Sequence, residues 1–272
     1  MKKSIMLLFV ISVLILNMFA DNPFIVIMYD SKTENSIGPF PPKRTVWAST
    51  IDKLREYNTK AVVMKFFYDL PKDEDKIFSS SIKNIPTFLQ ACINEIEPSN
   101  NKLESKYTIN TDRNYKDVIT GKKGWLPVSE LARNAYEVGF VDIRDINDIP
   151  IIEKYDNKYV KSLYFCILQF IFPDLRFENN SLVLNNKKII LNKYSEMHVD
   201  YPKEDNLKYI SLCDVLNNEV DMKIFENKIV IIGWDGSKMD TFNISTGTVN
   251  KHRVFIYGLY DMYNQLSQTK FD

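Results

Sequence analysis

Acidic and hydroxyl side chains stand directly after two apolar runs of the sequence. Asp30 and Ser31 follow the run 24–29, and further polar residues follow the run 228–232. The carboxyl ends of neighbouring parallel strands lie at one edge of a sheet, so these side chains are expected to converge there. They would form a pocket for a small polar ligand or, as an alternative, the carboxylate cluster of a hydrolase. The candidate site residues are Asp30, Ser31, Arg44, Trp234, Asp235, Gly236 and Asp240.

Sequence motifs of catalysis and cofactor binding are incomplete. The segment 233–236, GWDG, lacks the third glycine that opens a helix in the dinucleotide fingerprint. His198 and His252 have no ligand-type residue at metal-site spacing, and no G-x-S-x-G segment occurs. We therefore expect neither a metal nor a cofactor. Each candidate carboxylate can also be interpreted as a turn cap, and a non-enzymatic role is favoured over catalysis.

Charge and cysteine content exclude two further classes of protein. The 272 residues include 35 basic and 35 acidic side chains, so no overall field favours nucleic acid, and no nucleic-acid partner is expected. Cys92, Cys166 and Cys213 are an odd set, and each has apolar neighbours. Buried, unreactive thiols are favoured over a disulfide framework, and a single disulfide bond between two of these cysteines is the alternative.

The first twenty residues have the pattern of a secretory leader. Lys2 and Lys3 precede a mostly apolar run over 5–20, which is short for a membrane span. A signal peptide over 1–20 is predicted, with retention as a membrane anchor as the alternative because Met18 fits the cleavage pattern poorly. Residues 21–272 are then periplasmic or secreted.

An early strand, helix and strand follow one another after the leader. The run 24–29 and the run 61–67 are apolar, and Trp47, Ile51 and Leu54 form one helical stripe between them. This order is typical of a βαβ unit, and it predicts that the two strands pair in parallel through a right-handed crossover.

The central strand is predicted from the run 228–232, KIVII. It is apolar without alternation, rich in β-branched residues and ended by Gly233, which indicates a strand buried on both faces. Such a strand needs helices above and below it. We expect a single α/β domain with a mostly parallel or mixed central sheet covered on both faces.

The remaining chain alternates between short elements and loops. Residues 95–123 are polar and lack a sustained period, which predicts a surface excursion. Gly139 follows an apolar helical stripe over 128–135 as a C-terminal cap would. The other expected elements are a helix over 73–83, a strand over 87–93, a helix over 159–172, a hairpin joining 182–184 to 189–191, and a final strand or helix over 254–266.

The order of motifs resembles a known sensory family. YISLCDVLNNEVDMKIFENKIVIIGWDG (209–236), followed by VFIYGLYDMYNQL (254–266), is similar to the end of the second kind of CHASE-type extracellular sensory domain of bacterial histidine kinases and nucleotide cyclases. IVIMYDSKT (25–33), GPFPPKR (38–44) and KAVVMKFFYDLP (60–71) resemble its first strand, its glycine-proline-arginine loop and its second strand.

The chain departs from this family pattern at three places. Lys65 stands where an aspartate is usual, 149–152 lacks an arginine, and Tyr257 and Gly258 stand where a histidine is common. The resemblance implies an extracytoplasmic sensory or ligand-binding module for an unknown small molecule. We identify no further apolar span after Asp21 and no output module, so signalling would go through a partner, such as a membrane-bound protein. A pure interaction scaffold is a further alternative.

Overall fold

The computed structural model describes residues 22–111, 113–185, 187–201, 207–236, 239–245 and 247–268. The predicted leader and its cleavage site lie outside these residues. A seven-stranded sheet forms the centre of the fold. Its order is β15 (Lys208–Ser211), β1 (Phe24–Tyr29), β16 (Ile229–Trp234), β2 (Ala61–Met64) and β3 (Thr87–Ile93), and β3 also pairs with β7 (Glu137–Phe140) and β6 (Gly124–Trp125). Every pairing is parallel except that of β6 with β3.

The predicted central strand is β16, and its burial is confirmed. Residues 229–233 are all buried. Their side chains alternate between two cores, with Ile229 and Ile231 in one and Val230 and Ile232 in the other. The prediction that 24–29 pairs directly with 61–67 is wrong, because β16 lies between β1 and β2. A strand covered on both faces has no water for its backbone groups, and a neighbour on each side provides hydrogen-bond partners for them.

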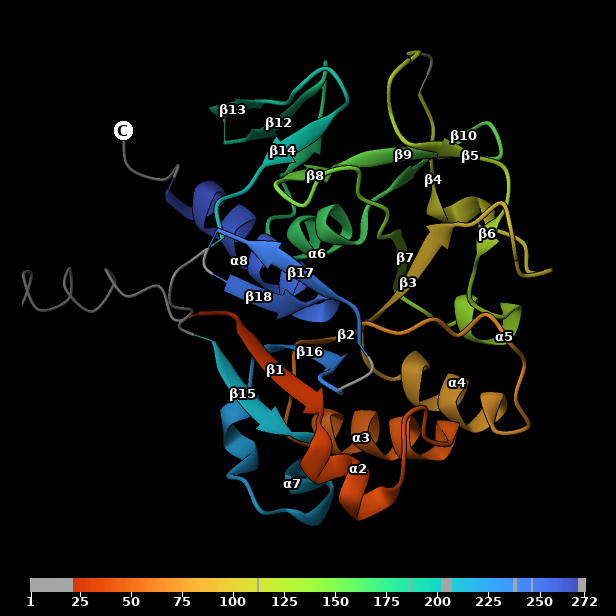
Figure 1. The fold of residues 1–272 in the computed structure, drawn as a ribbon, viewed down its shortest axis with the longest axis vertical. Coiled ribbons are helices and arrows are strands. Elements are labelled where there is room, and N and C mark those ends of the chain that lie inside the picture. Colours follow the sequence, from red (N-terminus) through yellow and green to blue (C-terminus); the bar gives the residue numbers. More distant parts are fainter. Residues whose placement is uncertain are drawn as a thin grey trace, which may run out of the picture.

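Helices cover both faces of this sheet, as predicted. One core contains α3 (Arg44–Glu56), α4 (Asp75–Lys83), α5 (Ser129–Ala132) and α7 (Leu212–Asn217), and the other contains α6 (Leu163–Ile171) and α8 (Lys251–Gln268). Figure 1 shows α3, α4 and α7 on one side of β1 and α6 and α8 on the opposite side. The short helix α2 (Ser31–Ile37) follows the carboxyl end of β1 directly.

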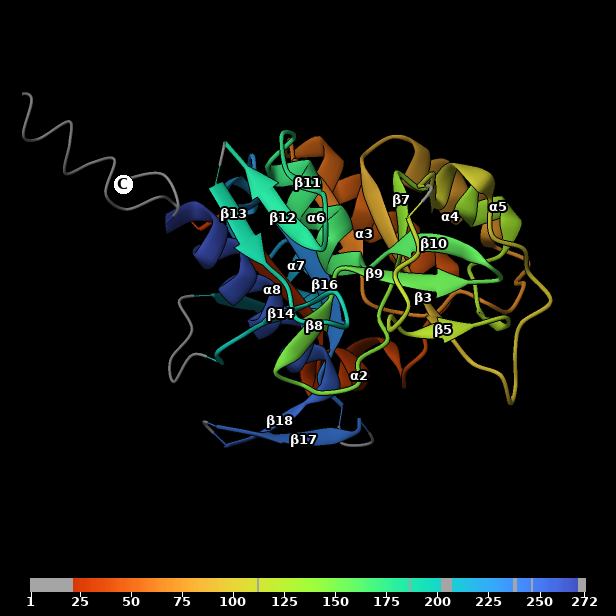
Figure 2. The same cartoon turned by 90° about the horizontal axis from the view of Figure 1, so that it is seen from above.

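Small antiparallel sheets surround the α6 side of the fold. The first sheet has the order β4 (Thr108–Ile109), β10 (Lys158–Lys161), β9 (Ile152–Tyr155) and β5 (Thr120–Gly121), and β5 is parallel to β9. The second sheet consists of β11 (Arg176–Phe177), β12 (Ser181–Leu184) and β13 (Lys187–Ile190). The third sheet pairs β14 (Glu196–His198) with β8 (Asp148–Pro150). The expected hairpin is confirmed as β12 and β13. A further hairpin of β17 (Thr241–Ile244) and β18 (Gly247–Asn250) projects from the body in Figure 2.

Two short 3-10 helices complete the elements, η1 (Ser105–Tyr107) and η2 (Met222–Phe225). The segment 95–123 contains η1, β4 and β5, and the buried Tyr107 hydroxyl donates to the Ala135 carbonyl oxygen at 3.0 Å. The helix expected over 159–172 starts later than predicted. Residues 158–161 form β10, and the Ser162 Oγ caps α6 by accepting from the Phe165 N–H.

Gly139 does not cap a helix, which corrects the expectation from sequence. It lies inside β7, and a β-carbon built on it would stand 2.3 Å from the Cα of Leu163 in α6. The glycine is therefore required because the backbone of α6 packs directly against the strand. The final element is a helix, α8, and none of the helices in the described residues is long and apolar enough to cross a membrane.

Candidate functional site

A cavity of about 330 Å³ opens at the carboxyl ends of β2, β7 and β16, beside the middle of β3. We name it the strand-end cavity. It lies where open parallel sheets usually hold their ligands. The lining residues are Phe40, Pro41, Lys65, Phe66, Phe67, Gln90, Val141, Trp234, Met239, Asp240, Lys251 and His252.

One wall of the strand-end cavity is aromatic. Phe40, on the loop between α2 and α3, stacks on Trp234 with ring centroids 4.5 Å apart, and Phe66 packs 5.2 Å from Phe40. Trp47 of α3 stacks behind Phe66 at 4.8 Å. The Trp234 Nε1 donates to Glu34 of α2 at 3.0 Å, which fixes the indole. This wall offers flat apolar surfaces whose positions are held from behind.

Lys65 is the buried cationic group of the cavity. It follows β2 directly, its side chain and backbone together are 4 % exposed, and its Nζ donates to the Gln90 Oε1 at 2.7 Å. The Nζ also lies 4.6 Å from the centre of the Phe255 ring of α8. Among the described residues, no carboxylate is within ion-pair distance. Burial, and then the charge of Lys251, lower the pKa of Lys65 to about 7.

His252 brings a second buried nitrogen donor from the first turn of α8. Its Nδ1 accepts the Trp234 backbone N–H at 2.8 Å, which places the proton of the neutral ring on Nε2. Burial holds the pKa of His252 well below its ordinary value, and the charges of Lys65 and Lys251 lower it further. A β-carbon on Gly233 would stand 3.3 Å from Nδ1, so the glycine lets the imidazole approach β16 closely.

The exposed part of the cavity carries one residue of each charge. Lys251 begins α8, and its backbone N–H donates to the Asp240 carbonyl oxygen at 2.9 Å. Both side chains are exposed. The lining therefore carries Lys65 and the neutral His252 inside, and Lys251 with Asp240 outside.

The structure separates the residues predicted to form the site. Trp234 and Asp240 line the cavity. Asp30 does not line it. Its Oδ1 caps α2 by accepting from the Thr33 N–H at 2.9 Å and also accepts from the Ser211 Oγ at 2.7 Å. Ser31 is exposed at the start of α2.

The other predicted residues also make contacts that hold the local structure. Asp235 accepts from the Arg253 Nη2 at 2.8 Å, and Gly236 lies against the Trp234 indole. Arg44 forms a buried ion pair with Asp75 at 2.9 Å. The three predicted carboxylates thus have different environments. No group of three or more ligand-type His, Cys, Asp or Glu side chains is found in the described part of the chain.

Sequence reasoning missed Lys65, Gln90 and His252 as members of the site. Lys65 carried a signal, because it is the charged residue directly after an apolar strand and differs from the family pattern there. His252 was considered only as a metal ligand, and no sequence pattern shows that α8 returns to the end of β16. Both side chains belong to the site through tertiary contacts.

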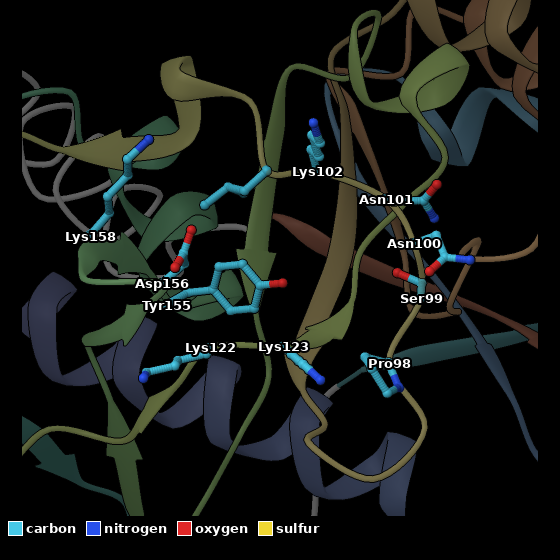
Figure 3. A pocket seen from close by; sticks show the side chains of 11 residues that line it. Pro98, Ser99, Asn100, Asn101, Lys102, Lys122, Lys123, Tyr155, Asp156 and Lys158 are labelled. Carbon is cyan, nitrogen blue, oxygen red and sulfur yellow. The ribbon is translucent and has the colours of Figure 1, made fainter.

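A second and larger cavity, of about 580 Å³, lies between the segment 95–123 and the turn that joins β9 to β10. We name it the lysine-lined cavity. Figure 3 shows Tyr155, Asp156 and Lys158 across from Ser99 and Asn100. Its other lysines are Lys102, Lys122 and Lys123. These lysines are exposed, in contrast with the buried Lys65.

The doubly covered, mostly parallel sheet defines the class of the protein as an α/β domain, and a cavity lies at the carboxyl edge of the sheet. The chain belongs to the CHASE2 domain family, whose family model matches residues 8–269. This confirms the resemblance found in the sequence. CHASE2 domains are extracellular sensory modules of signal transduction. Searches of curated proteins and of solved structures find no match.

Proposed function

We propose that the protein is an exported, non-enzymatic sensor that binds a small molecule in the strand-end cavity and signals through a partner protein, such as a membrane-bound one. The observation that carries this proposal is the cavity itself, with a rigid aromatic wall and buried polar donors at the carboxyl edge of the sheet. Ligand sites commonly combine a mostly apolar lining with a few fixed polar groups. Membership of a sensory family supports the same role.

Binding is favoured over hydrolysis by the surroundings of the predicted carboxylates. Asp30 and Asp235 are each held by local partners, and Asp240 is the single carboxylate among the lining residues. Cys92 and Cys166 are also poor nucleophiles. Burial raises the pKa of the Cys92 thiol to about 12 and also raises that of Cys166. The hollow at the sheet edge favours a ligand site over a pure scaffold.

Residues 21–272 form the extracytoplasmic domain under this proposal, with 1–20 as the leader. The charged start and short apolar run of the sequence support export. The family, which acts outside the cytoplasm, supports it independently.

A thermal-shift screen tests the binding function. Purified residues 21–272 are heated with sugars, amino acids, polyamines and small carboxylates. A compound that binds only the folded chain must raise the melting temperature with increasing concentration. We expect at least one class to do so, with the shift lost in Trp234→Leu and kept in Lys102→Met, which changes only the lysine-lined cavity. Shifts that depend on Lys102 and not on Trp234 would contradict the proposed site.

A further inference from the structure

The lining of the strand-end cavity carries more cationic and N–H donor side chains than carboxylates, and this imbalance indicates the class of its ligand. This inference rests on the proposed function and deepens it. Lys65 and His252 reach the cavity from β2 and α8, and Lys251 lies at its exposed side. Asp240 is the opposing carboxylate, and it is exposed. Buried charges in proteins are normally paired.

We propose that the strand-end cavity binds a small organic carboxylate with a planar apolar body, its carboxylate held by Lys65 and His252 and its ring held against Phe40, Phe66 and Trp234. The shape and the chemistry of the lining agree with this ligand. A volume of about 330 Å³ is near the lower end for ligand pockets, which suits a single ring with a short side chain.

Lys65 is the group that needs a counter-charge. An ammonium has three donors, and one is taken by Gln90 at 2.7 Å while the ring of Phe255 faces the same nitrogen. A carboxylate ligand supplies acceptors for the remaining donors as well as the missing charge. Hydrogen bonds between charged partners are stronger than neutral ones, particularly away from water.

His252 gives this site a hydrogen-bond donor whose direction is fixed. Since Nδ1 is occupied by the Trp234 backbone N–H, Nε2 is the donor that remains, and no described residue accepts from it. Its ring packs 5.6 Å from that of Phe66, at the border between the polar and aromatic parts of the lining. A carboxylate can therefore accept from Lys65 and His252 while its apolar body extends along the aromatic wall.

Binding of an anion is expected to be coupled to proton uptake. Lys65 faces Lys251, His252 and Phe255 of α8, Gln90 and Cys92 of β3, and Asp142 after β7. In the empty cavity the pKa of Lys65 is lowered to about 7, so the side chain is mostly neutral above that pH. A bound carboxylate favours the ammonium form. The affinity for a carboxylate should therefore fall as pH rises from about 6 to about 9, because the ligand binds the protonated form of Lys65 more tightly.

Isothermal titration calorimetry with three probes of similar shape and different charge tests the proposal. The probes are phenylacetate, phenylacetamide and phenethylamine, which carry a negative charge, no charge and a positive charge. We expect phenylacetate to bind about ten- to a hundredfold more tightly than the others, the value of hydrogen bonds to a charged group. At pH 8, two buffers with different heats of ionisation should show that binding takes up protons.

Variants assign the effect to the cavity. Lys65→Met keeps the volume, removes a buried charge and should weaken phenylacetate binding by about ten- to a hundredfold. Lys251→Met, at an exposed position, should weaken binding less and provides a second test if Lys65→Met does not fold. Lys83→Met, exposed on α4, is the matched control and should bind as the wild type does.

Three results would overturn the carboxylate assignment. These are equal binding of phenylacetamide, tighter binding of phenethylamine, and wild-type affinity for phenylacetate in both Lys65→Met and Lys251→Met. In each case the proposed sensory function still stands if a compound of another class binds in a Trp234-dependent way. If no compound of any class binds, both proposals fail.

Discussion

At the scale of single residues, burial decides which polar side chains belong to the site. Asp30, Arg44 and Asp235 were candidates from sequence because of their type and position, yet each is held by local partners. Lys65 and His252 line the cavity instead, because the strands and α8 bring them together. A sequence pattern places a residue at the end of a strand, but it does not show which side chains from distant segments meet there.

Arg44 is expected to stabilise the fold and not to bind the ligand. Its side chain and that of Asp75 are 10 % and 8 % exposed, and its guanidinium also stacks over Tyr68. Arg44→Met leaves the Asp75 carboxylate buried without its cation, which typically costs about 3–5 kcal/mol. Urea unfolding measures this loss. The double variant Arg44→Met with Asp75→Asn should recover part of this loss, and wild-type stability of Arg44→Met alone would contradict the structural role.

Glu153 of β9 is a buried acid that should make the stability of the protein depend on pH. Neither carboxyl oxygen has a hydrogen-bond partner among the described residues. Burial raises the pKa of Glu153 well above its ordinary value, and the nearby Asp142 charge raises it further. The folded state therefore keeps the Glu153 proton to higher pH than the unfolded state does. Stability is greatest below the unfolded pKa and is lost as pH rises through the folded pKa.

Glu153→Gln removes this titration while keeping the shape of the side chain. As pH rises from 5 to 8, the urea midpoint of the wild type should fall relative to that of Glu153→Gln, because only the wild type carries the raised pKa of Glu153. The control is Glu130→Gln, at an exposed position on α5. Parallel pH curves for wild type and Glu153→Gln would show that Glu153 does not control this dependence.

At the scale of elements, the apolar runs predicted the central sheet well. β1 was predicted at 24–29 and β3 at 87–93, and both were confirmed at these bounds. The position of β16 between β1 and β2 was not predictable from local patterns, since it depends on a segment about two hundred residues away from β1. The same limit applies to Gly139, because its packing role depends on the position of α6 against β7, which local patterns do not predict.

Gly139 and Gly258 make a matched pair for testing this packing. In Gly139→Ala the new β-carbon would meet the Leu163 backbone at 2.3 Å, so α6 must move, and we expect a loss of about 3 kcal/mol or more. In Gly258→Ala the nearest atom is at 3.4 Å, an ordinary contact, and a gain of roughly 0.5–1 kcal/mol is expected from the helix. Urea unfolding of both variants gives the comparison. Equal stabilities would contradict the close approach of α6.

At the scale of the whole molecule, the chain belongs to an extracellular sensory family, and its fold is a sheet covered by helices on both faces. The family model covers nearly the entire chain, and the sheet has the covered architecture that the sequence predicted. The identity of the ligand could not be predicted from sequence, because the charge balance of the cavity depends on three-dimensional contacts.

Export by the first twenty residues can be tested directly. The chain is fused to a reporter enzyme that is active only where disulfides form. We expect activity with the natural leader and none with Lys2→Glu and Lys3→Glu, which reverse the charge that precedes the apolar run. Equal activity for both fusions would contradict a secretory leader.

The most direct test of the account is a crystal structure of residues 21–272 grown with 4-bromophenylacetate. The anomalous signal of bromine locates the ligand without reference to any assumed site. We predict a bromine peak beside Phe40 and Trp234, with the carboxylate next to the Lys65 Nζ and the His252 Nε2. A bromine peak in the lysine-lined cavity, with the strand-end cavity empty, would contradict the central claim.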